Sequence, residues 1–265
     1  MYRYLVVRRD GPIEYVTINR PDVRNAFNDE VVADLQRWAD AVSADAGVRV
    51  VVLAGAGKVF SAGADASWMA RMASASVADN ERDAVATTAM LRAINALPVA
   101  VIGRVHGAAL GGGAGLAAVC DIVVAETRTV FGFTETKLGI LPAMISPFVI
   151  AKIGVSAARE LFLTGMRFDA VRARAIGLVH AVVPADELDA AVAGYIGEIL
   201  SAAPTAVAAA KALIPAVAGR TPDDVATLTA RTIAAQRGSP EGQEGLRAFL
   251  EKRDPSWLVR YCVAC

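Results

Sequence analysis

Two glycine-rich segments and one glutamate are the residues of this chain best suited to chemistry. The first segment is Phe60-Ser-Ala-Gly-Ala-Asp65, the second covers residues 107–115, and Glu135 follows shortly after. Loops of this composition expose backbone N–H groups, and two N–H groups aimed at one position can stabilise an oxyanion. A neighbouring carboxyl group can then transfer a proton. This combination favours chemistry at the carbonyl of a thioester.

The elements that must position these residues are parallel strands. Apolar runs at residues 48–53 and 99–105 are typical of buried parallel strands, and a glycine-rich segment follows each of them. Further strands are expected at residues 122–125, 130–133 and 179–183, and a β-hairpin at residues 4–8 and 14–18. Strands that alternate with helices indicate an α/β fold.

Helical patterns occupy most of the remaining chain. Asn28 or Asp29 is suited to cap a helix. Residues 66–97 are mostly helical in pattern, and we expect their polar part near residues 74–83 to form a mobile cover. We divide the chain into a core at residues 1–199, which carries the active site, and a helical C-terminal region at residues 200–265.

Composition excludes several classes of partner. The 265 residues include 27 basic and 27 acidic side chains, so no global positive field attracts nucleic acid. No apolar stretch is long enough to span a bilayer, and the N-terminus lacks a signal sequence, so we expect a cytoplasmic protein without membrane contact. Three cysteines predict neither a disulfide framework nor a metal site, and Cys120 is expected to be a buried apolar residue. The 55% hydrophobic composition favours an oligomer.

Two nucleotide-binding motifs are matched only in part. Residues 113–118 fit G-x-G-x-x-A, but the acidic residue at the end of the next strand, Glu126, follows Gly113 too closely for a dinucleotide-binding unit. Gly55-Ala-Gly57-Lys58 lacks the first glycine and the final Ser or Thr of a phosphate-binding loop. An oxyanion hole is therefore the remaining functional interpretation of the glycines.

Several ordered motifs together resemble the crotonase (enoyl-CoA hydratase/isomerase) superfamily. They are the first glycine-rich segment, His106-Gly-Ala-Ala-Leu-Gly-Gly-Gly113, Cys120-Asp121, and Glu135-Thr-Lys-Leu-Gly-Ile-Leu-Pro142. The resemblance covers almost the whole chain. It implies a spiral of ββα units and a helical C-terminal region that forms trimers, which often pair into hexamers. It also implies an acyl-CoA thioester substrate and no cofactor other than the coenzyme A that the substrate carries.

The resemblance assigns roles to individual residues. The backbone N–H groups of Ala64 and Gly112 would form the oxyanion hole, and Glu135 would transfer a proton at Cα of the acyl group. His106 would make local hydrogen bonds rather than transfer a proton. The implied substrate-binding set also includes Arg24, Ala26, Ala62, Asp65, Ala66, Gly111 and Ala143, with Phe249 and Lys252 reaching coenzyme A from a neighbouring subunit. Within this set the Ala62 carbonyl would meet the adenine, and the Ala143 N–H is available to hold a water molecule.

Gly115 is the main departure from the family pattern, because standard hydratases carry a second glutamate at this position. Three interpretations stay open. The run from Glu135 to Pro147 looks most like bacterial methylglutaconyl-CoA hydratases, and the space beside Gly115 would then accept a branched, carboxylated acyl group such as 3-methylglutaconyl. A Δ3-Δ2 enoyl-CoA isomerase needs only one carboxyl group. The third interpretation is a weakly catalytic acyl-CoA-binding protein.

Overall fold

A six-stranded sheet forms the centre of the computed structural model, which describes residues 1–259 and residue 261. β1 and β2 form an antiparallel hairpin, and every other neighbouring pair in this sheet is parallel. The strands are, in spatial order, β1 (Leu5–Asp10), β2 (Ile13–Ile18), β3 (Val50–Gly55), β4 (Ala100–Val105), β6 (Ile122–Glu126) and β9 (Ala181–Val183). All six strands agree with those expected from the apolar runs, within about two residues at each end.

A second, smaller sheet was not predicted as such. It contains β5 (Ala108–Leu110), β7 (Val130–Gly132) and β8 (Arg167–Asp169), and only β7 was expected from the sequence. The other two strands have three residues each, and β5 lies inside the glycine-rich segment that we expected to be a loop. Strands this short carry no alternating pattern that could reveal them.

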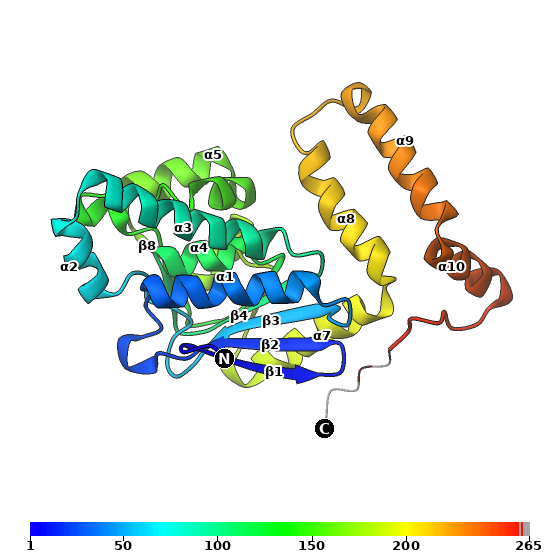
Figure 1. Ribbon diagram of the computed structural model, residues 1–265, viewed down its shortest axis with the longest axis horizontal. Helices are drawn as coiled ribbons and strands as arrows, with labels where there is room; N and C mark the ends of the chain where they lie inside the picture. The colour runs from blue at the N-terminus through cyan, green and yellow to red at the C-terminus, as the bar shows by residue number, and fades with distance from the viewer. Residues whose placement is uncertain (260, 262–265) are drawn as a thin grey trace.

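Helices cover both faces of the large sheet (Figure 1). On one face, α1 (Asp29–Ala44), α3 (Val77–Asn95) and α4 (Gly112–Val119) contribute to the main apolar core. On the other face, α7 (Leu188–Ser201) packs its buried side chains against those of β2, β3, β4 and β6. The side chain of Asn28 accepts a hydrogen bond from the backbone N–H of Val31 and caps α1, as expected.

The polar segment near residues 74–83 is largely helical, as the pattern of residues 66–97 predicted, and its role as a mobile cover stays a prediction. α2 (Ala66–Ser74) ends there, α3 begins at Val77, and only Ala75 and Ser76 lie between them. The Ser76 hydroxyl accepts a hydrogen bond from the backbone N–H of Asp79, so the serine caps α3. The sequence showed a run of polar residues there because the first turns of α3 are largely exposed to solvent.

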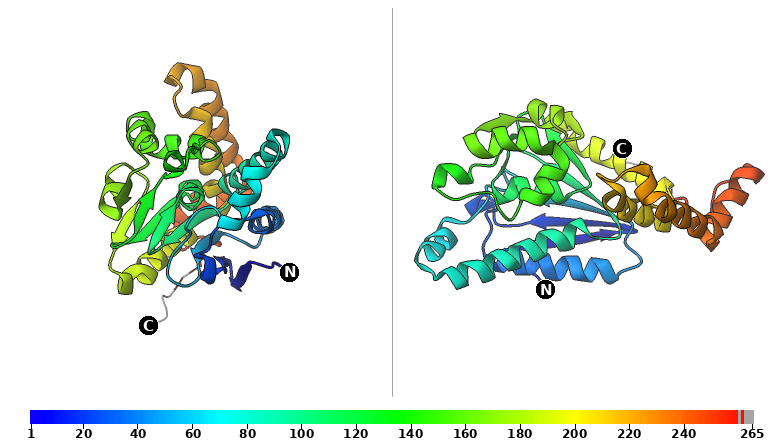
Figure 2. Two further views of the ribbon diagram at one scale, coloured as in Figure 1. Left: turned by 90° about the vertical axis from the view of Figure 1, so that its left-hand side faces the viewer. Right: turned by 90° about the horizontal axis from the view of Figure 1, so that it is seen from above.

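Further helices and short turns lie between these elements along the chain. They are α5 (Ser146–Thr164), α6 (Ala170–Ala175), and the short 3₁₀ turns η1 (Pro21–Val23), η2 (Glu135–Leu138) and η3 (Ala185–Glu187). The last helices, α8 (Pro204–Val217), α9 (Pro222–Gly238) and α10 (Pro240–Glu251), project from the core at the end opposite to α2 (Figure 1 and the right-hand view of Figure 2). They leave large apolar side chains exposed, among them Ile214, Leu246 and Leu250.

No single helix within the described range is long and apolar enough to cross a membrane. The bent pair Ala185–Ser201 and Pro204–Val217 meets that length and composition only when its two parts are taken together.

Candidate active site

The two glycine-rich segments lie side by side and are hydrogen-bonded to each other. The backbone N–H of Ser61 donates to the carbonyl of Ala108 over 3.1 Å, and the N–H of Leu110 donates to the carbonyl of Ser61 over 3.0 Å. A Cβ atom on Gly63 would lie 2.8 Å from the Leu110 carbonyl oxygen, and one on Gly113 would lie 2.5 Å from that of Ser61. The glycines are therefore needed for the close approach of the two backbones.

This approach places Ala64 and Gly112 at one cavity. Both residues line it, and no hydrogen bond found in the described part of the chain uses either backbone N–H group. Gly112 is the first residue of α4, where N–H groups have no partner within the helix and the helix dipole favours a negative charge. An oxyanion hole requires unpaired N–H groups at one cavity, and this role of Ala64 and Gly112 stays a prediction.

Glu135 lies at the same cavity, at the start of η2. Its Oε1 lies 3.2 Å from the position that a Cβ atom on Gly111 would take. Gly111 has a φ of 51°, so both its backbone conformation and the carboxyl group beside it favour glycine. Oε2 of Glu135 is buried and has no hydrogen-bond partner among the described residues. Burial raises the pKa of Glu135 above its ordinary value, as expected for a carboxyl group tuned for proton transfer.

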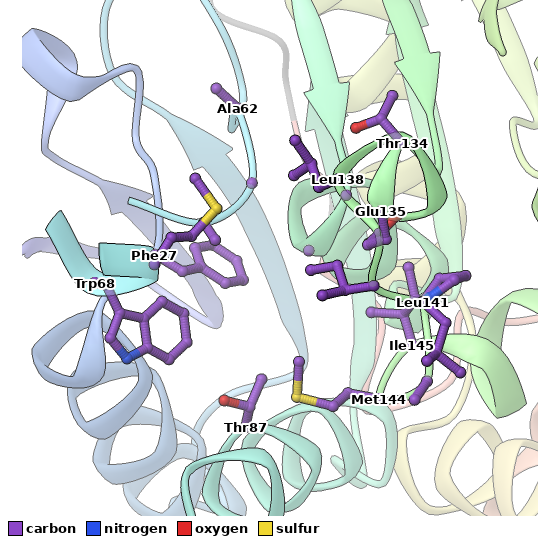
Figure 3. Close-up of a pocket in the computed structure, with 18 of the residues that line it drawn as sticks. Phe27, Ala62, Trp68, Thr87, Thr134, Glu135, Leu138, Leu141, Met144 and Ile145 are labelled. Carbon is purple, nitrogen blue, oxygen red and sulfur yellow. The ribbon is translucent and has the colours of Figure 1, made fainter. Parts of the chain in front are cut away.

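Apolar side chains form most of the cavity wall, which encloses about 160 Å³ (Figure 3). α2 contributes Trp68 and Met69 to this wall. The sequence did not single out Thr87 and Leu91 of α3, which lie farther along the chain and also line the cavity. The remaining apolar lining includes Phe27, Leu138, Ile140, Leu141, Pro142, Met144 and Ile145.

The residues predicted to bind the nucleotide part of coenzyme A flank this cavity. Ala62 lines it and donates its N–H to the Arg24 carbonyl over 2.9 Å, whereas no hydrogen bond within the described residues uses the Ala62 carbonyl. Arg24 has an exposed side chain and a left-handed backbone, with a φ of 56°. Ala26 is buried, and its carbonyl accepts a hydrogen bond from Arg20. Contact of Arg24, Ala26 and Ala62 with coenzyme A stays a prediction.

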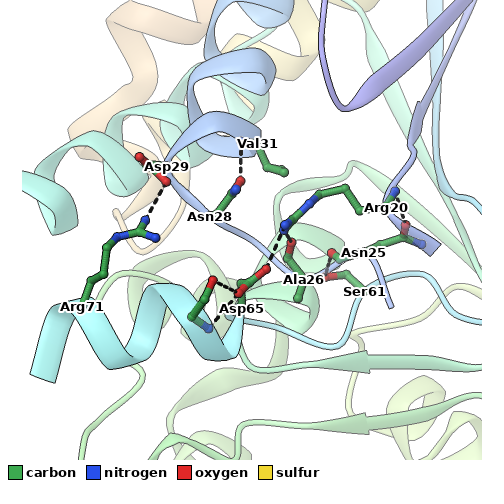
Figure 4. A network of polar contacts seen from close by, with 10 residues as sticks. Arg20, Asn25, Ala26, Asn28, Asp29, Val31, Ser61, Asp65 and Arg71 are labelled. Atoms are coloured by element: carbon green, nitrogen blue, oxygen red, sulfur yellow. Dashed lines mark hydrogen bonds and ion pairs between the residues drawn. The ribbon is translucent and has the colours of Figure 1, made fainter. Parts of the chain in front are cut away.

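Asp65 has a structural role in this single chain (Figure 4). Its carboxylate caps α2 by accepting hydrogen bonds from the hydroxyl and backbone N–H of Ser67, and it pairs with Arg20 over 2.8 Å. The Ser67 hydroxyl, the Ser67 N–H and the Arg20 guanidinium together lower the pKa of Asp65 to about 2. Ala66 is the first residue of α2. Neither residue lines the cavity, so a direct role in substrate binding stays a prediction.

Phe249 and Lys252 lie at the far end of the C-terminal helices. Phe249 is on α10 and is 81% exposed, and Lys252 directly follows that helix with a left-handed backbone. α10 and α2 lie at opposite ends of the molecule (Figures 1 and 2). Within one chain these residues are therefore remote from the cavity, and their contact with coenzyme A in a neighbouring subunit stays a prediction.

Two expectations about this site are wrong. The space beside Gly115 is not free, because Ile145, which is only 2% exposed, fills it; a Cβ atom on Gly115 would lie 2.7 Å from Cβ of Ile145. The N–H of Ala143 is not available for water, since it donates to the Leu141 carbonyl over 2.8 Å, although Ala143 does line the cavity. Both differences from expectation arise from the backbone conformation of residues 141–145, which places Ile145 against Gly115. The sequence pattern does not reveal this conformation.

The packing of Ile145 against Gly115 predicts a cost for any side chain at residue 115. Gly115→Ala should lower the free energy of unfolding by about 1–3 kcal/mol, as overpacked cores usually do. Gly115→Ala should cost less free energy of unfolding when it is made in the Ile145→Ala variant than when it is made in the wild-type protein. Denaturant unfolding of the four proteins measures the coupling. Additive effects would show that the two residues do not compete for space.

Two other residues behave as the sequence predicted. Nε2 of His106 lies 2.9 Å from the Gly57 carbonyl, a local hydrogen bond. Cys120 is fully buried, and burial raises the pKa of its thiol to about 12. Cys262 and Cys265 lie outside the described residues. Within those residues, no three His, Cys, Asp or Glu side chains gather where they could hold a metal ion.

Similarity to known proteins agrees with this geometry. The family model described as enoyl-CoA hydratase/isomerase matches residues 8–260. The short-chain-enoyl-CoA hydratase of Clostridium acetobutylicum is 31% identical over 94% of this chain and 95% of its own. The solved structure of AtuE from Pseudomonas aeruginosa is 38% identical, with a TM-score of 0.93, and covers 97% of this chain and 100% of that one. An enoyl-CoA hydratase structure from Shewanella pealeana is 36% identical, with a TM-score of 0.93 and 96% of each chain covered.

The fold and the site therefore define an α/β enzyme of the crotonase type. The chain belongs to the enoyl-CoA hydratase/isomerase family of the crotonase superfamily.

Proposed function

We propose that this enzyme adds water to the double bond of a 2-enoyl-CoA thioester. Two backbone N–H groups that have no partner among the described residues, from Ala64 and Gly112, lie at one cavity with the partly buried carboxyl group of Glu135, and this observation carries the proposal. Similarity to proteins named enoyl-CoA hydratases supports the same activity. Coenzyme A takes part only as the carrier of the acyl group, and no other cofactor is proposed.

The proposed reaction uses these groups in a defined order. The thioester oxygen accepts hydrogen bonds from the N–H groups of Ala64 and Gly112, which draws electrons from the conjugated double bond. Glu135 takes a proton from water as the water oxygen bonds to Cβ of the acyl group, and an enolate of the thioester forms. Glu135 then returns the proton to Cα, so that OH and H are added across the bond. One carboxyl group thus serves both proton transfers, because Ile145 fills the place of a second one.

The sequence suggested a branched, carboxylated acyl group, as in 3-methylglutaconyl-CoA. This cavity suits such a group poorly. Its one ionisable lining residue in the described chain is Glu135, which is itself acidic. Burying a second carboxylate without a cationic partner is costly. The branch also cannot use the space beside Gly115, which Ile145 fills. We therefore infer that an uncharged enoyl group is the better substrate.

Isomerisation of a 3-enoyl-CoA to a 2-enoyl-CoA is the second candidate activity. A single carboxyl group favours it, because moving a proton from Cα to Cγ needs one group that both accepts and donates. Binding of acyl-CoA with little catalysis is the third candidate, and it gives Glu135 no role.

A substrate panel separates these activities. Crotonyl-CoA, 3-methylglutaconyl-CoA and a 3-enoyl-CoA would be incubated with the enzyme, and mass spectrometry would detect addition of water. Hydration of crotonyl-CoA at a higher kcat/KM than 3-methylglutaconyl-CoA supports the proposal. Conversion of the 3-enoyl-CoA without hydration of any 2-enoyl-CoA would overturn it in favour of an isomerase. Binding without turnover would leave the acyl-CoA-binding interpretation.

Assembly into a homotrimer or a dimer of trimers in the cytoplasm completes the proposal. The apolar side chains that α8, α9 and α10 expose support an oligomer, since such surfaces usually lie in interfaces. Light scattering coupled to size-exclusion chromatography measures the mass of the particle. A monomer at assay concentrations would contradict this part of the proposal.

A further inference from the structure

Two polar side chains that the proposed mechanism does not use, those of Thr87 and Thr134, line the same cavity, and only the hydroxyl of Thr87 is buried without a partner among the described residues. Thr87 lies on α3, is 5% exposed, and its Oγ1 is buried without a hydrogen-bond partner. A threonine within a helix commonly donates to the carbonyl four residues earlier, here that of Asp83, but this hydrogen bond is absent between these two described residues. A buried hydroxyl without a partner destabilises the folded protein. Oγ1 itself is not accessible in this structure, so the side chain must rotate about χ1 before a ligand in the cavity can supply the partner. Without such a ligand, an apolar residue would be more stable at this position.

The position of Thr87 relates it to the acyl group rather than to the thioester. In the proposed mechanism Ala64 and Gly112 bind the thioester oxygen, and Glu135 lies beside the reacting carbons of the acyl group. Coenzyme A is predicted to lie on the side of Ala62. Figure 3 shows Thr87 at the opposite end of the cavity from Ala62, between Trp68 and Met144. A thioester held at the oxyanion hole, with coenzyme A leaving past Ala62, directs its acyl chain toward Thr87.

We propose that Thr87 is a specificity-determining residue that recognises an uncharged oxygen atom, a hydroxyl or a carbonyl, near the distal end of the acyl group. This inference rests on the proposed activity toward 2-enoyl-CoA thioesters. Around Thr87 the wall is formed by apolar side chains of Trp68, Leu91, Met144 and Ile145. A hydroxyl can both donate and accept one hydrogen bond, which suits an alcohol or a ketone. A carboxylate would lack a cationic partner there.

Isosteric variants test the proposal. Thr87→Val keeps the shape and removes the hydroxyl, whereas Thr87→Ser keeps the hydroxyl and removes the methyl group. Substrates would be pairs of 2-enoyl-CoA thioesters, from short to medium chain length, that end in either a methyl or a hydroxyl group. At the best chain length the wild-type protein should prefer the hydroxylated member of the pair. Thr87→Val should lower that preference about tenfold, the worth of one hydrogen bond, and Thr87→Ser should retain it.

Binding keeps this test separate from the proposed activity. Dissociation constants of the matching saturated acyl-CoA thioesters, with and without the terminal hydroxyl, should show the same loss of preference in Thr87→Val, even if no substrate is hydrated. Thr87→Val should also be at least as stable to heat as the wild-type protein, which excludes misfolding as a cause. An equal effect of Thr87→Val on both members of each pair, or no preference in the wild-type protein at any chain length, would overturn the inference.

Discussion

Replacing Glu135 with glutamine should lower kcat for hydration about 10²–10⁴-fold, the range expected when a general acid–base group is lost. The effect should be large because no other carboxyl group of the described chain lines the cavity to take over the proton. Glutamine keeps the shape and polarity of the side chain, so binding of a saturated acyl-CoA should change little. Steady-state kinetics together with a binding measurement would show this split. Unchanged turnover would contradict a role for Glu135 in proton transfer.

The raised pKa of Glu135 adds a pH-dependent consequence. Burial disfavours the ionised form, so the folded protein binds this proton more tightly than the unfolded chain does. Ionisation of the buried Glu135 carboxyl group therefore lowers the free energy of unfolding. This loss is absent below the ordinary pKa of glutamate and becomes complete as pH rises through the raised pKa. Glu135→Gln should therefore be more stable than the wild-type protein at neutral pH, and the difference should vanish in acid. Denaturant unfolding at several pH values measures it; a stability difference that grows toward acid pH would contradict this assignment.

Gly112→Pro should also lower kcat severely, by about 10²–10³-fold, because it removes one donor of the proposed oxyanion hole. A backbone N–H group can rarely be deleted without unfolding a helix. Here, however, Gly112 is the first residue of α4, the helical position where proline is tolerated best. A Cβ atom at this position would lie 3.3 Å from the Phe27 ring, a close contact that a small shift can relieve.

Gly112→Ala is the matched control for this variant. Alanine adds the same Cβ atom beside Phe27 but keeps the N–H group, so it should retain most of the activity that the proline variant loses. Circular dichroism and thermal unfolding would establish that both variants fold. Comparable activity of the two folded variants would show that the Gly112 N–H does not stabilise the transition state.

Most of the large sheet could be predicted from the sequence because its strands are long, apolar and buried. Residues 48–53 and 99–105, for example, correspond closely to β3 and β4. The small sheet could not, since β5 and β8 have three residues each and owe their conformation to pairing with β7. β7 and β9 also have three residues each, but they were predicted because longer, mostly apolar runs contain them, at residues 130–133 and 179–183.

The sequence by itself determined where the chain needs glycine, and it predicted the roles of the glycine segments and of Glu135. Gly63, Gly111 and Gly113 allow backbone approaches and conformations that side chains forbid, and this property belongs to the residue type. Only the tertiary structure decided what lies around them. Ile145 fills the space beside Gly115, and Thr87, whose buried hydroxyl has no partner among the described residues, lies in the cavity wall. The packing of segments distant in sequence decides which side chain occupies a space.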